Sequence, residues 1–165
     1  MASAKTTEIF NFSAQQIFDV IKDFESYSDF LSEVTESKIV EDLGPNKKIV
    51  KLTVSMIKDF SYQIVTTLDD SNDKAQSIKW VFHSGDVFKS NSGSWILKSI
   101  SENQTQVTYE VEADFKIFVP SMIAKKMISV SLPKMMQTYK DRIQQINSTS
   151  SSAASSTVST KLKKK

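Results

Sequence analysis

The fold of this chain is decided between residues 107 and 146, where the spacing of apolar residues changes from two to about 3.6. The stretch VTYEVEADF (107–115) alternates apolar and polar residues, which is typical of a strand with one buried and one solvated face. After Val119-Pro120-Ser121, apolar residues recur at helical spacing, at Ile128, Leu132, Met135, Met136, Tyr139, Ile143 and Ile146. The sequence therefore predicts a strand followed by one long helix.

Six earlier segments also have the composition of strands. They cover residues 6–12, 34–41, 48–57, 60–68, 76–83 and 88–100. Because strands this close together in sequence favour antiparallel neighbours, we expect one antiparallel sheet of seven strands. A curved sheet that is covered by a single helix often leaves a cavity between the two.

Two short helices are expected between the first two strands. Ser13 and Gln16 have the spacing of a capping box, and Ile17, Val20 and Ile21 give the following helix an apolar stripe. A second helical segment is expected over residues 25–31. The predicted order of elements is β-αα-β6-α.

Length and composition indicate one domain with a tail. The chain has 165 residues, of which 39% are hydrophobic, which is enough for one sizeable core. We predict a domain over residues 1–147 and a disordered, serine-rich tail with a basic end over residues 148–165. No stretch reaches the roughly 18 apolar residues of a membrane span, and the N-terminus lacks a signal-peptide core. We therefore expect a soluble, cytoplasmic protein.

The net charge of +2 depends on the tail. Four of the last five residues are lysines, and without them 17 basic residues face 19 acidic ones. Arg142 is the only arginine, which does not suit bidentate recognition of phosphate or guanine, so no binding to duplex DNA is expected. The terminal lysines are suited to contact ribosomal RNA or an anionic membrane, or they serve only to solubilise the chain.

Several stretches resemble one known superfamily. The run FSAQQIFDV (12–20) and the run DFESYSDFL (23–31) resemble a helix and a "D-hydrophobic-E-x-Y-P-x-F-L" segment of the START-like (SRPBCC) superfamily. The similarity is to its polyketide cyclase and coenzyme Q-binding branch, which includes ribosome-association toxin proteins. Ser28 replaces the usual proline. The runs GSWIL (93–97) and TQVTY (105–109) are similar to the family's hairpin, and Val119-Pro120 with Ser131-Leu132-Pro133 is similar to its C-terminal helix.

This resemblance implies an α+β helix-grip fold of the START/Bet v 1-like kind. Such a fold has a seven-stranded antiparallel sheet wrapped around a long C-terminal helix, with a hydrophobic cavity between them. The resemblance does not fix the function, because the superfamily hosts binders, carriers and cyclases on one scaffold.

The faces predicted to point inward are almost purely apolar. General acid–base catalysis needs a titratable group, and these faces offer mainly the hydroxyls of Tyr62 and Tyr109. We therefore favour non-enzymatic binding of a hydrophobic small molecule, such as a lipid, quinone or polyketide-like compound; a solid core without a cavity is the alternative. The predicted ligand-binding residues are Val54, Met56, Tyr62, Ile64, Trp80, Phe82, Trp95, Tyr109, Val111, Met135, Met136 and Tyr139.

Other chemistries find little support in the sequence. His83 is the only histidine, its strand parity places it on the outer face, and the chain has no cysteine. We predict no catalytic residue, no metal and no cofactor.

Two alternative functions stay open. One is a ribosome- or membrane-associated protein that uses the basic tail, and the other is a polyketide cyclase or dehydratase that relies on Tyr62, Tyr109 or His83.

The predicted covering helix contains a proline. Pro133 favours a kink, and methionines follow it directly. We expect Met135, Met136 and Tyr139 to form a movable gate over the cavity, with residues 24–31 as the opposite rim.

Overall fold

The computed structural model of the chain describes residues 1–56, 58–126 and 132–163. Its seven strands are β1 (Ala2–Phe10), β2 (Val34–Asp42), β3 (Lys47–Ser55), β4 (Asp59–Asp69), β5 (Ala75–Gly85), β6 (Phe88–Ser101) and β7 (Gln104–Phe115). The helices are α1 (Ala14–Lys22), the 3-10 helix η1 (Phe24–Ser26), α2 (Tyr27–Phe30), α3 (Ser121–Lys125) and α4 (Leu132–Lys163). The predicted order of the strands is confirmed, whereas the described residues after β7 form two helices, α3 and α4, where one was expected.

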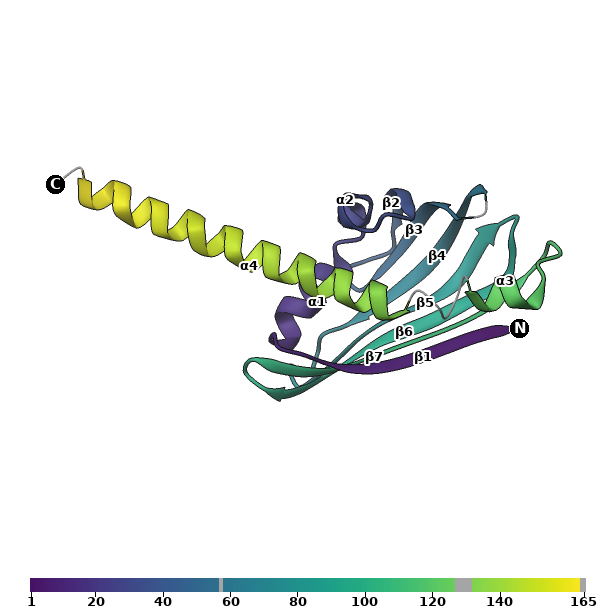
Figure 1. The fold of residues 1–165 in the computed structure, drawn as a ribbon, viewed down its shortest axis with the longest axis horizontal. Helices are drawn as coiled ribbons and strands as arrows, with labels where there is room; N and C mark the ends of the chain where they lie inside the picture. The colour runs from purple at the N-terminus through teal and green to yellow at the C-terminus, as the bar shows by residue number, and fades with distance from the viewer. Residues whose placement is uncertain (57, 127–131, 164–165) are drawn as a thin grey trace.

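All seven strands form one antiparallel sheet with the order β1-β7-β6-β5-β4-β3-β2. Figure 1 shows α4 lying across this sheet, with α1 at one end of the sheet and α3 at the other. The arrangement is the predicted helix-grip fold. Two strands have other bounds than expected: β1 begins at Ala2 and not at residue 6, and β3 ends at Ser55. Ile57, which was expected in that strand, and Ile128, which was expected in the long helix, lie outside the described residues.

Extra residues in several strands curve the sheet. In β5, Ser84 pairs with Gln63 and Phe82 pairs with Ile64, so His83 between them is a bulge. The register also shifts twice in β2 and twice in β6. Because a bulge bends its strand and increases the local twist, these shifts help the sheet to bend around α4.

The start of α1 is capped as predicted. The Gln16 backbone N–H donates to the Ser13 hydroxyl at 3.2 Å, and the Ser13 backbone N–H donates to Oε1 of Gln16 at 2.9 Å. Buried Ile17 and Ile21 on α1 join the main core with Phe10. The helix therefore closes one end of the space under the sheet.

A polar and an apolar contact together fix α4 to the edge strand β1. The Lys140 ammonium lies 2.7 Å from Oε1 of Glu8, and it also lies 5.1 Å from the centroid of the Phe10 ring. Buried Tyr139 and Ile143 hold the same part of α4 in the core.

Pro133 lies next to the part of the chain that is not described. The described part of α4 begins at Leu132, and residues 127–131 before it lie outside the described residues. From Leu132 onward the backbone is helical through Pro133. Whether Pro133 kinks the covering helix therefore stays a prediction.

The end of α4 differs from the predicted disordered tail. The backbone continues as a helix to Lys163, and Figure 1 shows that this part extends away from the sheet with no other element beside it. Residues 148–160 are mostly serine, threonine and alanine. Serine and threonine are weak helix formers, and a helix without tertiary packing is marginal in water. Disorder of residues 148–165 in solution therefore stays a prediction.

Amide hydrogen exchange tests this prediction. We expect residues 148–163 to exchange at the rate of an unstructured chain, because no other helix or strand lies beside this part of the backbone (Figure 1). Residues 135–146 of the same helix should exchange slowly, and they serve as the internal control. Slow exchange throughout residues 148–163 would show that the tail is a stable helix.

Candidate ligand-binding cavity

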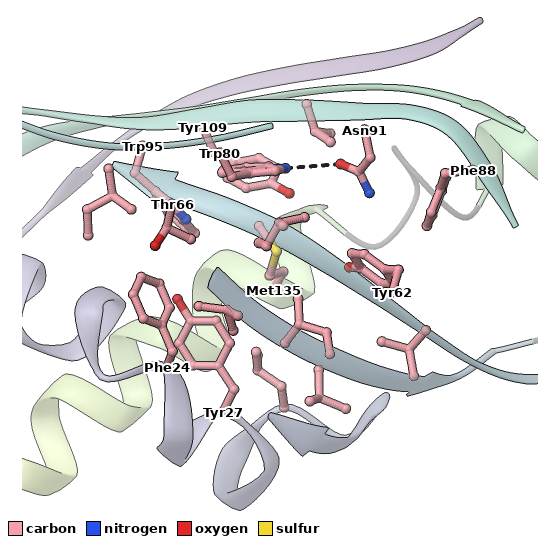
Figure 2. A pocket seen from close by; sticks show the side chains of 18 of the residues that line it. Phe24, Tyr27, Tyr62, Thr66, Trp80, Phe88, Asn91, Trp95, Tyr109 and Met135 are labelled. Atoms are coloured by element: carbon pink, nitrogen blue, oxygen red, sulfur yellow. Dashed lines mark hydrogen bonds between the residues drawn. The ribbon is translucent and has the colours of Figure 1, made fainter. Parts of the chain in front are cut away.

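A cavity of about 240 Å³ lies between the sheet and α4. Its walls come from strands β2 to β7, from α4 and from residues 24–31 (Figure 2). An apolar cavity of about 150 Å³ is known to hold benzene, and pockets for drug-sized ligands measure about 300–1,000 Å³. The space therefore suits a compact apolar molecule.

Ten of the twelve predicted binding residues line this cavity. They are Val54, Met56, Tyr62, Ile64, Trp80, Trp95, Tyr109, Val111, Met135 and Tyr139. The cavity also includes Phe24, Tyr27 and Leu31, from the segment that was expected to form a rim. That these residues bind a ligand stays a prediction.

Two predicted binding residues lie elsewhere. Met136 is fully buried in the main core, because it is one position on from Met135 and so about 100° further around α4. Phe82 packs instead against a separate cluster that contains Val87, Phe88 and Ala113. Neither side chain lines the cavity, so a role for either in contacting a ligand is not supported.

Two polar residues in the wall, Thr66 and Asn91, were not predicted. The Thr66 hydroxyl donates to the backbone carbonyl of Lys48 at 3.1 Å, so its hydrogen is already used. Asn91 differs, because Nε1 of Trp80 donates to its Oδ1 at 3.0 Å. An indole N–H is only a donor, so the amide oxygen of Asn91 must face Trp80. The Asn91 NH₂ group then remains, and no described residue accepts from it.

Trp80 reaches this position because residue 93 is glycine. Trp80 on β5 pairs with Gly93 on β6, and a Cβ atom at Gly93 would overlap the six-membered ring of the indole and the backbone oxygen of Glu110. The indole therefore lies directly over the backbone of β6. Gly93 thus fixes where the Trp80 N–H, and with it the Asn91 amide, is placed.

Aromatic rings connect this part of the sheet to α4. The ring centroids of Trp80 and Tyr109 are 5.7 Å apart, those of Tyr109 and Trp95 are 4.7 Å apart, and those of Trp95 and Tyr139 are 4.9 Å apart. At the other end, Tyr62 packs edge-on against Phe88 at 5.1 Å. Such aromatic pairs are stabilising, so they help to hold this wall of the cavity against α4.

The four tyrosines of the chain all line the cavity, but only two of their hydroxyls are engaged. Tyr27 donates to the backbone carbonyl of Ile21 and is hydrogen-bonded to Tyr139. No described residue hydrogen-bonds the hydroxyl of Tyr62 or Tyr109. Figure 2 shows Tyr62 and Asn91 in the same half of the view, close to Phe88, with the rings of Tyr109 and Trp80 side by side. Two hydroxyls and one amide are thus free to meet a ligand.

Burial keeps these tyrosines neutral. Desolvation raises the pKa of Tyr62 to about 12, and it raises the pKa of Tyr27, Tyr109 and Tyr139 well above the ordinary value of about 10. His83 is exposed and does not line the cavity. Among the described lining residues, tyrosines are therefore the only titratable groups.

The fold and the cavity define the START-like class of proteins. Residues 10–140 match the family described as "Polyketide cyclase / dehydrase and lipid transport". The chain therefore belongs to this family, and the predicted resemblance to the START-like (SRPBCC) superfamily is confirmed. A search of curated proteins finds no match.

Solved structures support the same fold. A START superfamily protein from Mycobacterium smegmatis has a TM-score of 0.71 at 19% identity, over 87% of this chain and 98% of that one. The Zhui aromatase/cyclase from Streptomyces sp. R1128 has a TM-score of 0.62 at 16% identity, over 88% and 87%. Human STARD10 has a TM-score of 0.76 at 15% identity, over 87% and 63%. At these identities the likeness concerns the fold alone.

The remaining predictions about location and partners are only partly tested. Within residues 1–56, 58–126 and 132–163, no helix has the length and apolarity that crossing a membrane requires. Contact of the basic tail with a ribosome or a membrane stays a prediction, as does a location in the cytoplasm.

A pH titration tests the burial of the tyrosines. In the folded protein, tyrosinate absorbance should not rise near pH 10, because the pKa of each tyrosine is raised. The unfolded chain binds fewer protons than the folded one above about pH 10, so the contribution of the tyrosines to stability should be constant below that pH and be lost above it, at a rate of up to about 1.4 kcal/mol per pH unit for each tyrosine. The chain in denaturant, which should titrate near pH 10, is the control. A full tyrosinate signal near pH 10 without unfolding would contradict the structure.

The Gly93→Ala substitution tests the placement of Trp80. The added methyl group should displace the indole and cost about 1–3 kcal/mol of stability through overpacking. It should also shift the tryptophan emission, because the bond to Asn91 is lost. Ser94→Ala, one residue along the same strand, should change neither. Unchanged stability and emission in Gly93→Ala would mean that Trp80 does not lie over β6.

Proposed function

We propose that this protein binds a hydrophobic small molecule without transforming it, in the cavity between the sheet and α4. One observation carries the proposal. The cavity wall is mostly apolar, yet the buried residue Asn91 contributes an amide NH₂ group, and Tyr62 and Tyr109 contribute hydroxyls, that have no partner among the described residues. Buried polar groups are ordinarily hydrogen-bonded, so these groups are suited to receive a ligand.

The chemistry of the wall narrows the class of ligand. Tyrosine, tryptophan and phenylalanine rings surround the space, which favours a molecule with flat rings or a short hydrocarbon body. The Asn91 NH₂ group only donates, so the ligand needs an acceptor such as a carbonyl oxygen. A compact ring ketone or quinone-like compound meets both conditions, and it agrees with the family, whose description includes polyketide cyclases and lipid transport.

The titratable groups favour a binder over an enzyme. A general acid or base works best with a pKa near the operating pH, and burial moves the pKa of each lining tyrosine away from neutrality. His83, the third residue on which a cyclase could have relied besides Tyr62 and Tyr109, is exposed and does not line the cavity. Neither Ile57 nor residues 127–131 contain a titratable side chain. The protein can therefore orient a carbonyl but has little means to move a proton.

A pair of isosteric probes tests the proposal. The protein should bind 2-acetylnaphthalene more tightly than 2-isopropenylnaphthalene, in which a CH₂ group replaces the carbonyl oxygen. One hydrogen bond contributes about 0.5–1.5 kcal/mol, so the preference should be about two- to tenfold. Ligand-observed NMR measures both affinities without relying on tryptophan emission.

Variants of the two polar residues in the cavity wall show which side chain causes the preference for the carbonyl compound. Asn91→Leu should abolish the preference for the carbonyl compound, whereas Thr66→Val should keep it, because the Thr66 hydroxyl already donates to Lys48. If neither naphthalene binds, the cavity is not a ligand site of this class. If both bind equally well, the polar groups do not select the ligand.

Two neighbouring methionines distinguish the cavity from the core. Met135→Trp should fill part of the cavity and weaken probe binding at least several-fold, with little effect on the melting temperature. Met136→Trp should cost about 1–3 kcal/mol of stability, because Met136 is fully buried in the core. Thermal melting and probe titration of both variants are needed. Equal destabilisation by the two changes would show that Met135 also belongs to a solid core.

A further inference from the structure

A group of exposed apolar side chains follows the last strand. Phe118 is 91% exposed and Met122 is 82% exposed, and Ile117 and Ile123 beside them are also exposed. Ile117, Phe118 and Met122 line one shallow depression together with Met1. Proteins that remain monomeric in water rarely expose large contiguous apolar patches, so a patch of this kind marks an interaction surface.

The charge of the same segment indicates what it contacts. Residues 116–126 read KIFVPSMIAKK and contain three lysines and no acidic residue. Lys116, Lys125 and Lys126 are all exposed. An aromatic and aliphatic face flanked by lysines is typical of segments that lie in the interface of an anionic membrane. A second copy of the chain fits less well, because it would bring three further positive charges against these three.

The patch lies at the end of the sheet where the cavity reaches the surface. The antiparallel order brings together the start of β1, the end of β7 and the connections between β3 and β4 and between β5 and β6. Figure 1 shows α3 and the N-terminus at this end, far from the C-terminus. Met56, which follows β3, lines the cavity and is also 40% exposed. An apolar molecule leaving the cavity past Met56 would thus emerge on the side of the molecule that carries the patch.

We propose that residues 116–126 dock this protein on an anionic membrane surface. Phe118 and Met122 enter the boundary between headgroups and acyl chains, and the three lysines lie among the headgroups. The end of the sheet that carries Met56 then faces the bilayer. Docking would complement the proposed function, because an apolar ligand could then pass between the cavity and the bilayer without crossing water. The test below contains no ligand, so its result does not depend on whether the cavity binds one.

Vesicle sedimentation of the full chain tests the docking. The protein should pellet with vesicles of phosphatidylcholine and phosphatidylserine, and much less with phosphatidylcholine alone, and added salt should weaken the binding. The double variant Phe118→Ser/Met122→Ser should bind at least about tenfold more weakly, because each inserted CH₂ group contributes about 0.8 kcal/mol. The matched control is Val81→Ser/Ile100→Ser, which removes two other exposed apolar side chains and should bind like the unmodified protein.

A further variant separates this surface from the basic tail. Replacing Lys161, Lys163, Lys164 and Lys165 with serine in the full chain should leave most of the vesicle binding intact. The proposal would be overturned if this variant lost vesicle binding while the Phe118→Ser/Met122→Ser variant kept it in full. Equal binding to vesicles with and without phosphatidylserine would overturn it too, because the lysines would then have no role.

A probe at a single site shows whether the patch enters the lipid. The chain has no cysteine, so Met122→Cys gives one attachment point for a nitrobenzoxadiazole dye. Its emission should shift to the blue and gain intensity when phosphatidylserine vesicles are added. The same dye on Ile100→Cys, on β6, should not respond. Membrane docking would be refuted if the emission of the dye on residue 122 did not shift. It would also be refuted if light scattering showed a dimer that depends on Phe118 while the protein did not bind vesicles.

Discussion

The width of a single helix is the constraint on which the rest of this structure depends. An α-helix with its side chains is about 10–12 Å across. Strands lie about 4.8 Å apart, so seven of them span about 30 Å. One helix therefore covers less than half of the sheet, and α4 lies where the main core requires it. The remaining space must be filled by other elements, by large side chains or by a ligand.

This protein combines all three ways of filling that space. The segment from α1 to α2 closes one side, where buried Phe24 and Tyr27 reach into the gap. Aromatic rings that run from Trp80 to Tyr139 bridge the sheet and α4. These rings pack on one another, and the cavity lies beside them. Its polar groups are set by the same packing, because the Trp80 N–H orients the amide of Asn91.

The sequence predicts the sheet and most of the cavity wall because both follow from a period of two. Residues such as Val54, Tyr62, Tyr109 and Val111 alternate with polar neighbours, and their inward direction needs no tertiary information. The same rule would have placed Asn91 inward, since it shares parity with Gly93 and Trp95. It was missed because a polar residue gives no signal in a hydrophobic pattern.

Two departures from the predicted cavity wall have specific physical causes. Phe82 lies beside the bulge at His83, where an extra residue changes which neighbours a side chain meets, and no sequence signal marks that bulge. Met135 and Met136 are both apolar and adjacent, so helical spacing alone does not decide which one faces the cavity and which one the core.

The two ends of the space under the sheet differ in what holds them. Toward the C-terminal side of the core, Tyr139, Ile143 and the pair of Lys140 with Glu8 join α4 to the sheet and to β1. Toward the start of α4, half-buried Met135 and exposed Met56 line the cavity. Among the described residues, buried aromatic and ionic contacts thus anchor the first end of the space, whereas an exposed side chain of the cavity wall lies at the second.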